Sequence, residues 1–280
     1  MKRPAAEKGV VLVTILVVMA LCVTVIVAMT TASERSTRAT LGDLEAGQAR
    51  ALLTAGEAGA VSALLLDLAN PPEADGLSEA WARLAQSDVS ISGGSFSLEI
   101  WDEAARFNLN TLTADTAWSR QMIGNIVAVT GLNPEVATRI AAALKGGKPL
   151  LQIEDLASRA GLAAGEIAAL APFATATPDL SGGVNINTAS LALLSALLPD
   201  PGSVDIIVTE RKTRLITPDT LQRLGLVLPE GLTLRSDVFG LKIGVSSGAS
   251  QLTAFSTIHR WRDPKGHAHA VVSARKFGRL

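Results

Sequence analysis

The longest uncharged stretch of the chain begins just after Lys8 and ends before Glu34. Its apolar part, residues 10–29, would span about 30 Å as a helix, which is the hydrocarbon thickness of a bilayer. The apolar core of a cleaved secretory signal is shorter, about 7–15 residues, and a small-residue cut site follows it. The segment therefore predicts a membrane anchor that stays attached to the protein.

The charges around this run predict its orientation. Lys2, Arg3 and Lys8 precede it, against a single acid, Glu7. Positively charged flanks stay on the cytoplasmic side, so we expect the remainder of the chain to be exported. The single cysteine, Cys22, lies inside the apolar run, so no intrachain disulfide can form.

The composition argues against a nucleic-acid partner and favours helices. The formal net charge is -1 and only 18% of residues are charged, so the chain has no strong basic field to attract phosphates. Apolar residues make up 48% of the chain, and alanine and leucine dominate its expected core. Both residues are strong helix formers.

The helical pattern continues from the apolar run to residue 69 and ends at Pro71 and Pro72. Apolar residues recur at spacings compatible with one buried stripe on this segment. They are Leu41, Leu44, Leu52, Ala55 and Ala58. The two parts together predict one rod of about 60 residues, roughly 90 Å long at 1.5 Å per residue.

Strand patterns appear on both sides of a helical region. Residues 89–101 alternate as one half-buried strand, with Phe96, Leu98 and Ile100 on the same face. Residues 111–173 and 190–224 carry helical patterns. Alternation returns from Asp237, with a four-residue turn at residues 263–266. This order predicts an α+β fold, with an antiparallel sheet interrupted by a helical insertion.

The helical region contains an internal repeat. Residues 108–111 read NLNT and residues 185–188 read NINT, and asparagines of this kind cap helices and close Asx turns. Each copy later has an acid-bearing helix start followed by Gly-Leu, at residues 161–162 and 225–226. We therefore expect two related helical modules.

The second copy has the pattern of a helix-hairpin-helix or SAM-like unit, which raises DNA binding as an alternative. A DNA-binding hairpin offers glycine amides to a phosphate. Here the hairpin at residues 198–202 contains Asp200 and two prolines, which lack the amide donor. Arg211, Lys212 and Arg214 nearby are expected to form a solvated face, and we expect no nucleic acid to bind.

Patterns of catalysis and metal binding are weak. Ser246 sits in a G-x-S-x-G pattern, but strand-like sequence follows it where a hydrolase has a helix. Asp102 and Glu103 are adjacent and point to opposite faces of a strand, which disfavours acid–base work. His267 and His269 share a strand face, but even with His259 no cysteine or clustered acid completes a zinc site. The tryptophans at positions 81, 101, 118 and 261 are expected in the core or at interfaces.

Several ordered motifs together resemble one family. The basic leader ends in Lys8-Gly9 directly before the apolar run, which resembles a prepilin leader. The run from Asp102 to Asn110, DEAARFNLN, and the NINTA of residues 185–189 complete the pattern. The combination resembles the type II secretion minor pseudopilin K family, also called general secretion pathway protein K, over nearly the whole chain.

The resemblance implies processing at the leader. A prepilin peptidase would cut between Gly9 and Val10, and Val10 would become the N-methylated end. Most pilins carry a glutamate at the fifth position after the cut, to pair with a neighbour's terminal amine. This chain has Thr14 there, which is expected of a subunit at the very tip of a filament.

The resemblance also implies an organisation and a location. The sheet would be pilin-like, and the head would lie in the periplasm below the outer membrane, anchored by a single pass in the bacterial inner membrane. The expected segments are a removed leader (1–9), the transmembrane helix (10–30), the periplasmic spine helix with the first strand (31–107), the first helical module (108–180), the second module (181–236) and the closing strands (237–280).

The implied function is non-enzymatic: a minor pseudopilin that supports protein export from the tip of the pseudopilus. Its implied partners are minor pseudopilins I and J, the other pseudopilins and the prepilin peptidase. No cofactor is expected. Family members often have an acidic segment between the modules that suits calcium, and residues 139–150 contain no acid here, which disfavours that site. An ordinary single-pass anchor, a minor pilin of a type IV pilus-like system, a membrane-anchored DNA-uptake protein and an anchored hydrolase remain as alternatives.

Overall fold

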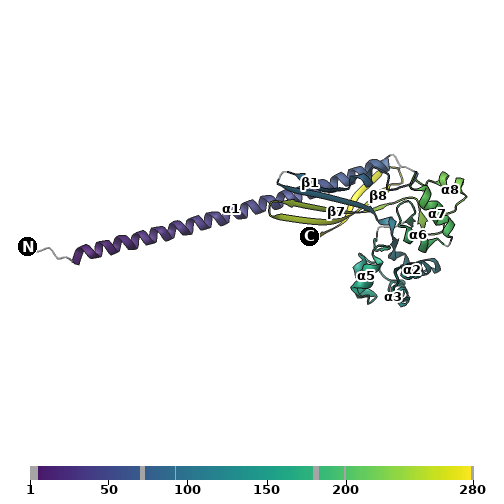
Figure 1. Cartoon of the computed structure of the whole chain (residues 1–280), viewed down its shortest axis with the longest axis horizontal. Coiled ribbons are helices and arrows are strands. Elements are labelled where there is room, and N and C mark those ends of the chain that lie inside the picture. The colour runs from purple at the N-terminus through teal and green to yellow at the C-terminus, as the bar shows by residue number, and fades with distance from the viewer. Residues whose placement is uncertain (1–5, 70–72, 92, 179–182, 199, 279–280) are drawn as a thin grey trace, which may run out of the picture.

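A single helix, α1 (Ala6–Ala69), accounts for 64 residues. The computed structural model describes residues 6–69, 73–91, 93–178, 183–198 and 200–278. The N-terminal half of α1 projects away from the rest of the protein, and its C-terminal half lies along a sheet (Figure 1). The predicted rod of about 60 residues is confirmed, and the proline pair expected to end it lies outside the described residues.

The sheet has five antiparallel strands in the order β1-β2-β7-β8-β9. Their bounds are β1 (Gln86–Ile91), β2 (Gly94–Asp102), β7 (Val238–Ser247), β8 (Ser250–Arg262) and β9 (Ala268–Gly278). The three C-terminal strands and the turn at residues 263–266 are confirmed. The turn closes with a bond from the Gly266 amide to the Asp263 carbonyl, at 2.9 Å.

The prediction of one strand over residues 89–101 is wrong, because this segment forms the hairpin of β1 and β2. Gly93 turns the chain with a positive φ of 83°. A side chain at Gly94 would place its Cβ 1.9 Å from the Ser246 carbonyl oxygen, so the strand can pass there only as glycine. Serine alternates with apolar residues on both sides of the turn, so the two strands were read as one.

The buried face of α1 is not the one that the sequence predicted. Leu41 and Leu44 are 51% and 57% exposed, and Ala55 and Ala58 are exposed as well. The residues that face the sheet are Ala49, Leu53, Glu57, Ala60 and Leu64. They pack on one side of the sheet with Phe239, Leu241, Ile243, Val245, Ala254 and Ile258. Leu52, the fifth residue of the predicted stripe, is half-buried and packs against this core, while the other four lie on the outer side of the helix. Apolar spacing therefore identified a face but not its partner.

The first helical module lies between β2 and the second module. Two short strands, β3 (Phe107–Asn108) and β4 (Ala174–Thr175), pair in parallel at its base. Its helices are α2 (Ala117–Thr130), α3 (Glu135–Leu144), α4 (Leu156–Arg159) and α5 (Ala164–Leu170), with short 3-10 turns at residues 109–114 and 153–155. Thr116 caps the start of α2 and Gly131 ends it with a φ of 70°.

The second module repeats this plan. Its base is the parallel pair β5 (Val184–Asn185) and β6 (Leu232–Thr233). Its helices are α6 (Leu191–Leu197), α7 (Pro201–Glu210) and α8 (Pro218–Leu224). The N-caps of the three helices are Ser190, Asp200 and Thr217, whose side chains accept bonds from backbone amides of the first turn. Residues of these types are favoured at helix starts and disfavoured in helix interiors.

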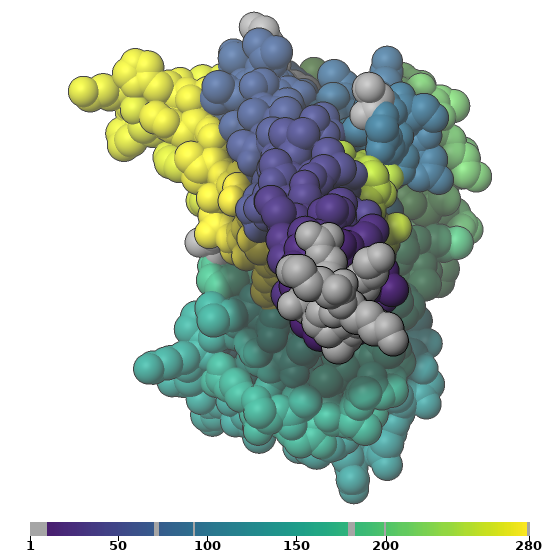
Figure 2. All heavy atoms as spheres, turned by 90° about the vertical axis from the view of Figure 1, so that its left-hand side faces the viewer, coloured from purple at the N-terminus to yellow at the C-terminus, as the bar shows by residue number. Residues whose placement is uncertain are grey.

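The molecule therefore has two separate cores. One joins α1 to the sheet, and the other is shared by both modules, for example through Met122 and Ile126 of α2 and Leu193 and Leu197 of α6. Viewed along the rod, the first module (teal) hangs to one side and makes the head much wider than the helix (Figure 2). The α+β class with a helical insertion in an antiparallel sheet is confirmed.

Candidate functional site

The bare half of α1 is the largest unpartnered apolar surface of the described chain. Residues 10–44 are all exposed, and the large apolar side chains of residues 10–29 are 50–68% exposed. The helix from Val10 onward is the one element of the described residues that is long and apolar enough to cross a membrane. A surface of this size is covered in a functioning protein, by lipid or by other helices.

Polar groups within this run are satisfied by the helix itself. The Thr14 hydroxyl donates to the Val10 carbonyl at 2.9 Å, and Thr24 bonds Ala20 in the same way at 2.8 Å. An unbonded hydroxyl is costly in hydrocarbon, so these bonds make the run compatible with lipid. Thr14, the position without the usual glutamate, thus offers no charge and no free donor.

The other predicted leader residues are only partly covered by the structure. The helical backbone runs unbroken through the Gly9–Val10 bond, and Val10 is 67% exposed. Lys2 and Arg3 lie outside the described residues. Cleavage and methylation at this bond stay predictions.

The first hydrogen bonds between α1 and the head lie C-terminal to this run. Glu45 accepts a bond from the Ala249 amide at 2.9 Å, and Gln48 accepts one from the Ser247 hydroxyl at 3.2 Å. Residues 30–44 therefore form a bare stalk of about 22 Å between the apolar run and the head. The sequence patterns did not reveal this stalk, because they predicted that Leu41 and Leu44 would be buried.

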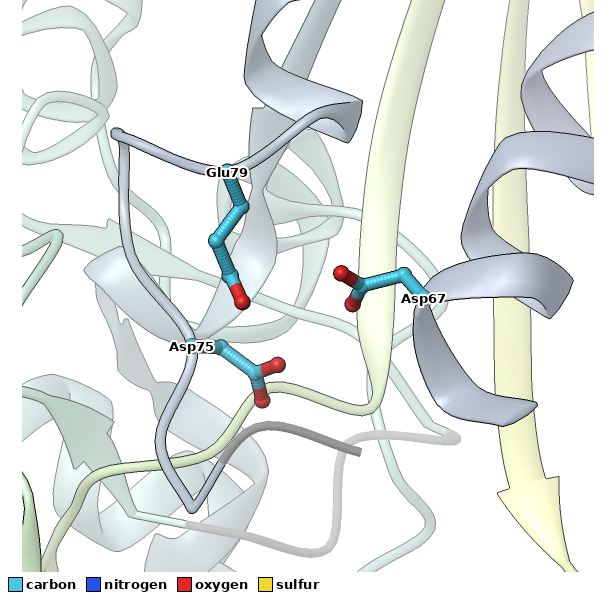
Figure 3. A group of neighbouring side chains, drawn as sticks. All are labelled: Asp67, Asp75 and Glu79. Carbon is cyan, nitrogen blue, oxygen red and sulfur yellow. The ribbon is translucent and has the colours of Figure 1, made fainter. Parts of the chain in front are cut away.

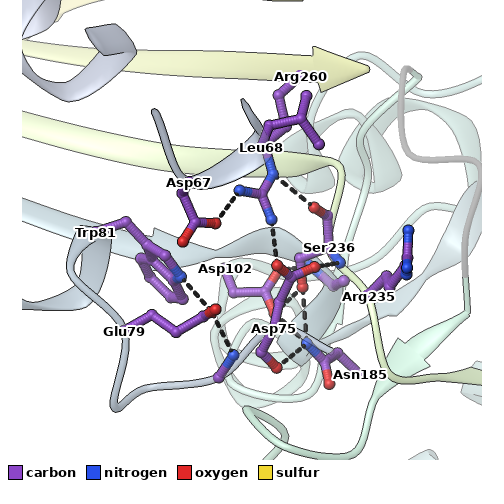
Figure 4. Close-up of polar contacts among 12 residues, drawn as sticks. Asp67, Leu68, Asp75, Glu79, Trp81, Asp102, Asn185, Arg235, Ser236 and Arg260 are labelled. Carbon is purple, nitrogen blue, oxygen red and sulfur yellow. Dashed lines mark hydrogen bonds and ion pairs between the residues drawn. The ribbon is translucent and has the colours of Figure 1, made fainter. Parts of the chain in front are cut away.

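A buried arginine holds the C-terminal end of α1 to the sheet. Arg260 of β8 contacts Asp67 at 2.5 Å and also contacts Asp75 (Figure 4). Its guanidinium lies 4.7 Å above the centre of the Phe239 ring. Burial opposes the charge of Arg260, but Asp75 and Asp67 outweigh it and its pKa is raised. Asp75 comes from the loop after α1, so one side chain fixes helix, loop and strand.

Three acids at this place could in principle hold a cation. One carboxylate oxygen from each of Asp67, Asp75 and Glu79 lies within 4.8 Å of the others (Figure 3). Arg260 already supplies a positive charge to the first two. Glu79 accepts bonds from the Gly76 amide at 2.8 Å and from Trp81 Nε1 at 2.9 Å. Both bonds to Glu79 go to its Oε2 atom, and the other two acids are paired with Arg260, so the cluster fits an ion pair rather than a metal centre.

The adjacent carboxylates Asp102 and Glu103 join the sheet to different modules. Asp102 accepts bonds from the hydroxyls of Ser236 and Thr188, both at 2.6 Å, and Thr188 belongs to the second module. Glu103 accepts a bond from Thr175 of the first module at 2.7 Å. Burial raises the pKa of Asp102 to about 6. The two side chains diverge as predicted, but sequence alone gave no sign of this joining role.

The repeated asparagines build the same loop in each module. Asn110 accepts from the Leu150 amide at 2.7 Å and donates to the Leu150 carbonyl at 3.0 Å. Asn187 makes the same two bonds with Ile216, both at 3.0 Å. The predicted repeat is therefore confirmed as a structural device that ties each module's first loop to a later one.

The features that raised DNA binding are occupied within the protein. Asp200 accepts bonds from the amides of Gly202 and Ser203, so its carboxylate fills the helix start that would meet a phosphate. Arg211 is partly buried and donates to the carbonyls of Ile186 and Ala189. The hairpin thus presents an acid where a phosphate would have to approach.

The serine of the hydrolase-like pattern lies at a strand end. Ser246 is the second-last residue of β7, and its hydroxyl bonds the amide and the hydroxyl of Ser95, at 2.9 and 3.0 Å. Across the described ranges, no histidine or acid bonds to it. Of the tryptophans, Trp81 is fully buried and Trp261 is 37% exposed.

Comparison with known proteins points to one family. Type II secretion system protein K of Klebsiella pneumoniae is 26% identical over 231 residues, which covers 69% of this chain and 71% of that protein. Its counterpart in Pseudomonas aeruginosa is 27% identical over 242 residues, which covers 73% and 72%. No family profile matches the chain.

A solved structure shares the fold. The crystal structure of the GspK-GspI-GspJ complex from the type 2 secretion system of enterotoxigenic Escherichia coli contains a chain that matches with a TM-score of 0.65 and 22% identity. The match covers 86% of this chain and 99% of that chain. The fold of most of this chain is therefore one already seen in a solved structure.

Proposed function

We infer that this chain belongs to the type II secretion system protein K family and acts as a minor pseudopilin at the tip of the periplasmic filament. The observation that carries the inference is the division of α1. Its N-terminal half is bare and apolar, and its C-terminal half is the central support of a wide head. Minor pseudopilins I and J are its neighbours, by analogy with the complex of the solved relative.

The mechanism is packing rather than chemistry. The apolar run is stored in the inner membrane and then packs against the spine helices of other subunits in the filament. The insertion makes the head too wide to stack within a shaft of narrower subunits, so the subunit ends the filament (Figure 2). We therefore propose no catalytic activity and no cofactor.

Processing and orientation belong to the same proposal. The peptidase cuts after Gly9 on the cytoplasmic side, Val10 becomes the methylated terminus, and the head lies in the periplasm. The hydroxyl at Thr14 supports the tip position, because it cannot pair with the charged terminus of a subunit above it.

Mass spectrometry of the N-terminus and co-purification with pseudopilins I and J test the proposal. Wild-type protein from its host is expected to begin at methylated Val10 and to retain I and J. Gly9→Val is expected to keep the leader and to lose assembly and secretion. Gly42→Ala is a matched control in the same helix, where an added methyl meets nothing within 4 Å. A mature protein that starts at Met1, or that starts beyond residue 30, contradicts the proposal.

A further inference from the structure

The outer edge of β9 has no neighbouring strand in the described sheet. The strand order places β9 beside β8 alone, and β1 forms the opposite edge. From Ala268 to Val272 the strand pairs with β8 residue by residue, and the register shifts beyond Val272. The β8–β9 hairpin (yellow) lies at the margin of the head, across α1 from β1 (blue) (Figure 2). Residues 268–272 therefore offer their free backbone groups to a further strand.

The alternation of the ladder identifies these backbone groups. The Asp263 amide donates to the His267 carbonyl at 2.9 Å, which sets the hydrogen-bonded pairs at every second position along the two strands. The amide of Arg260, the residue opposite Ala270, accordingly points towards β7 and donates to the Asp237 carbonyl at 2.8 Å. The backbone groups that point away from β8 are those of Ala268, Ala270 and Val272.

The open stretch lacks the features that usually protect a free strand edge. Lysine and acidic side chains, prolines and bulges keep such edges from pairing. Residues 268–272 read AHAVV and contain none of these. The other outer strand, β1, has a register shift between Gln86 and Val89, and Asp88 inside it has a positive φ of 47°. The sheet is thus protected at one edge and open at the other.

Both faces of the open edge can bury side chains of an added strand. Ala270 and Val272 are only partly buried against the core beneath α1. Side chains alternate along a strand, so Val271 lies on the opposite face, where it is 45% exposed. Aliphatic side chains on an added strand would extend both surfaces.

The surroundings of this edge are basic. Residues 262–278 contain two arginines, two lysines and one acid, in a chain with a formal net charge of -1. Arg275 is paired with Glu57, but Arg262 and Lys276 bond neutral oxygens, and Lys265 is exposed. The uncompensated positive charge on both sides of residues 268–272 favours a negatively charged partner.

We propose that the edge of β9 at residues 268–272 binds an extended acidic segment of another protein, which adds to the sheet as a sixth strand. Main-chain hydrogen bonds supply the affinity, and alternating aliphatic side chains fit the two faces. Acids at the ends of the segment meet the lysines that flank the edge, Lys265 and Lys276. The proposal concerns the head alone and does not depend on the position of the subunit in a filament.

Three labelled peptides separate strand pairing from charge. Full-length protein in detergent is titrated with fluorescein-labelled EVTVTVE, and binding is followed by fluorescence anisotropy. We expect saturable binding with a dissociation constant below about 1 mM. The basic peptide KVTVTVK should bind at least about tenfold more weakly, because the edge repels it. An EVTVTVE peptide with N-methyl groups on its three central residues keeps the charge but loses the amides for strand pairing, so it should not bind.

Two variants and one control place the binding at β9. Ala270→Pro removes an outward amide without removing a bond to β8, and it should raise the dissociation constant of EVTVTVE at least about fivefold. Lys265→Glu should raise it about threefold. Lys212→Glu makes the same charge change at an exposed site next to α7 and should leave affinity unchanged. Circular dichroism verifies that each variant is folded.

Three results would overturn the proposal. The first is the absence of saturable binding of EVTVTVE below about 1 mM. The second is equal affinity for the N-methylated peptide, which needs no variant of the protein. The third is a dimer of the wild type in sedimentation that Ala270→Pro dissolves, because a second copy of this chain would then occupy the edge.

Discussion

Buried charged side chains connect the sheet to α1 and to the two helical modules. Arg260 ties α1 and the following loop to β8, while Asp102 and Glu103 each reach a different helical module. All of these side chains are nearly buried and bonded to named partners. Removing one partner of such a group costs far more than its net contribution, because the other is left unsatisfied in a medium of low dielectric.

Asp102 should make the stability of the head depend on pH. Its folded-state pKa is about 6 and its unfolded-state value is near 3.8. Stability from this group is complete below pH 4 and is lost as pH rises to 6, by up to about 3 kcal/mol. Asp102→Asn should remove this slope, and urea unfolding followed by tryptophan fluorescence at pH 4 to 6.5 measures it. Asp75, whose pKa burial also raises, is present in both proteins and cancels. Parallel profiles of the two proteins would refute the assignment.

Arg260→Met should destabilise the head by about 3–5 kcal/mol, because Asp67 and Asp75 would lose their buried cation. Arg262→Met on the same strand is the control. Its guanidinium bonds exposed carbonyls at the end of α1, so its loss should cost at most about 1 kcal/mol. Equal losses of unfolding free energy in the two variants, measured with urea, would show that the buried ion pairs contribute no more stability than the exposed bonds of Arg262.

At the scale of elements, α1 has two faces with different tasks. Apart from Glu57, its sheet-facing residues are small or aliphatic. Gly56 lets the helix approach so closely that a methyl there would sit 3.0 Å from Ile243 and Phe96. The opposite face carries the apolar stripe that includes Leu44 and Ala55, which nothing in the described chain covers. In the proposed filament that outer face is where other helices pack.

Leu53→Ala and Leu44→Ala separate these two faces. Leu53 is 2% exposed in the core between α1 and the sheet, so its truncation should cost about 2–5 kcal/mol of head stability. Leu44 is 57% exposed, and its truncation should change stability by less than about 0.5 kcal/mol. Thermal unfolding of both variants provides the comparison, and an equal loss for Leu44→Ala would mean that the outer face also supports the fold.

Local patterns predicted the elements well but not their partners. The NLNT and NINT repeats predicted two related modules, because Asx turns are encoded within a few residues. The hairpin at Gly93 was missed although the sequence marks it: Gly93-Gly94 is a turn signal, and the apolar positions shift from odd numbers before it to even numbers after it. The buried face of α1 and the joining roles of Asp102 and Glu103 depend on contacts with residues far away in the chain, such as Ser236, and no short pattern contains that information.

At the scale of the whole molecule, the apolar run and the head are linked by a stalk that packs against no other part of the described chain. Residues 30–44 are exposed on all sides, with only one ion pair, Glu34 to Arg38, along them. A lone helix of this length is marginal in water, so the stalk depends on the anchored segments at its two ends.

Hydrogen exchange should distinguish the exposed stalk from the part of α1 that packs on the sheet. In detergent micelles, amides of residues 33–44 are expected to exchange far faster than those of residues 48–64, which are packed on the sheet. In assembled filaments the stalk amides should become protected, because neighbouring helices would cover them. Equal protection of both segments in the isolated protein would mean that the stalk has a partner within its own chain.

The helical insertion leaves the sheet at Asp102 and returns at Phe239, and these two residues are paired on adjacent strands β2 and β7. A polypeptide of any size can therefore occupy this position without altering the strand register. The two modules also share a core of their own. The helical insertion is therefore a separately packed unit placed between the paired strands β2 and β7. In the proposed filament, a variant with the insertion excised and the gap closed by a tight turn would be a subunit slim enough to be built upon.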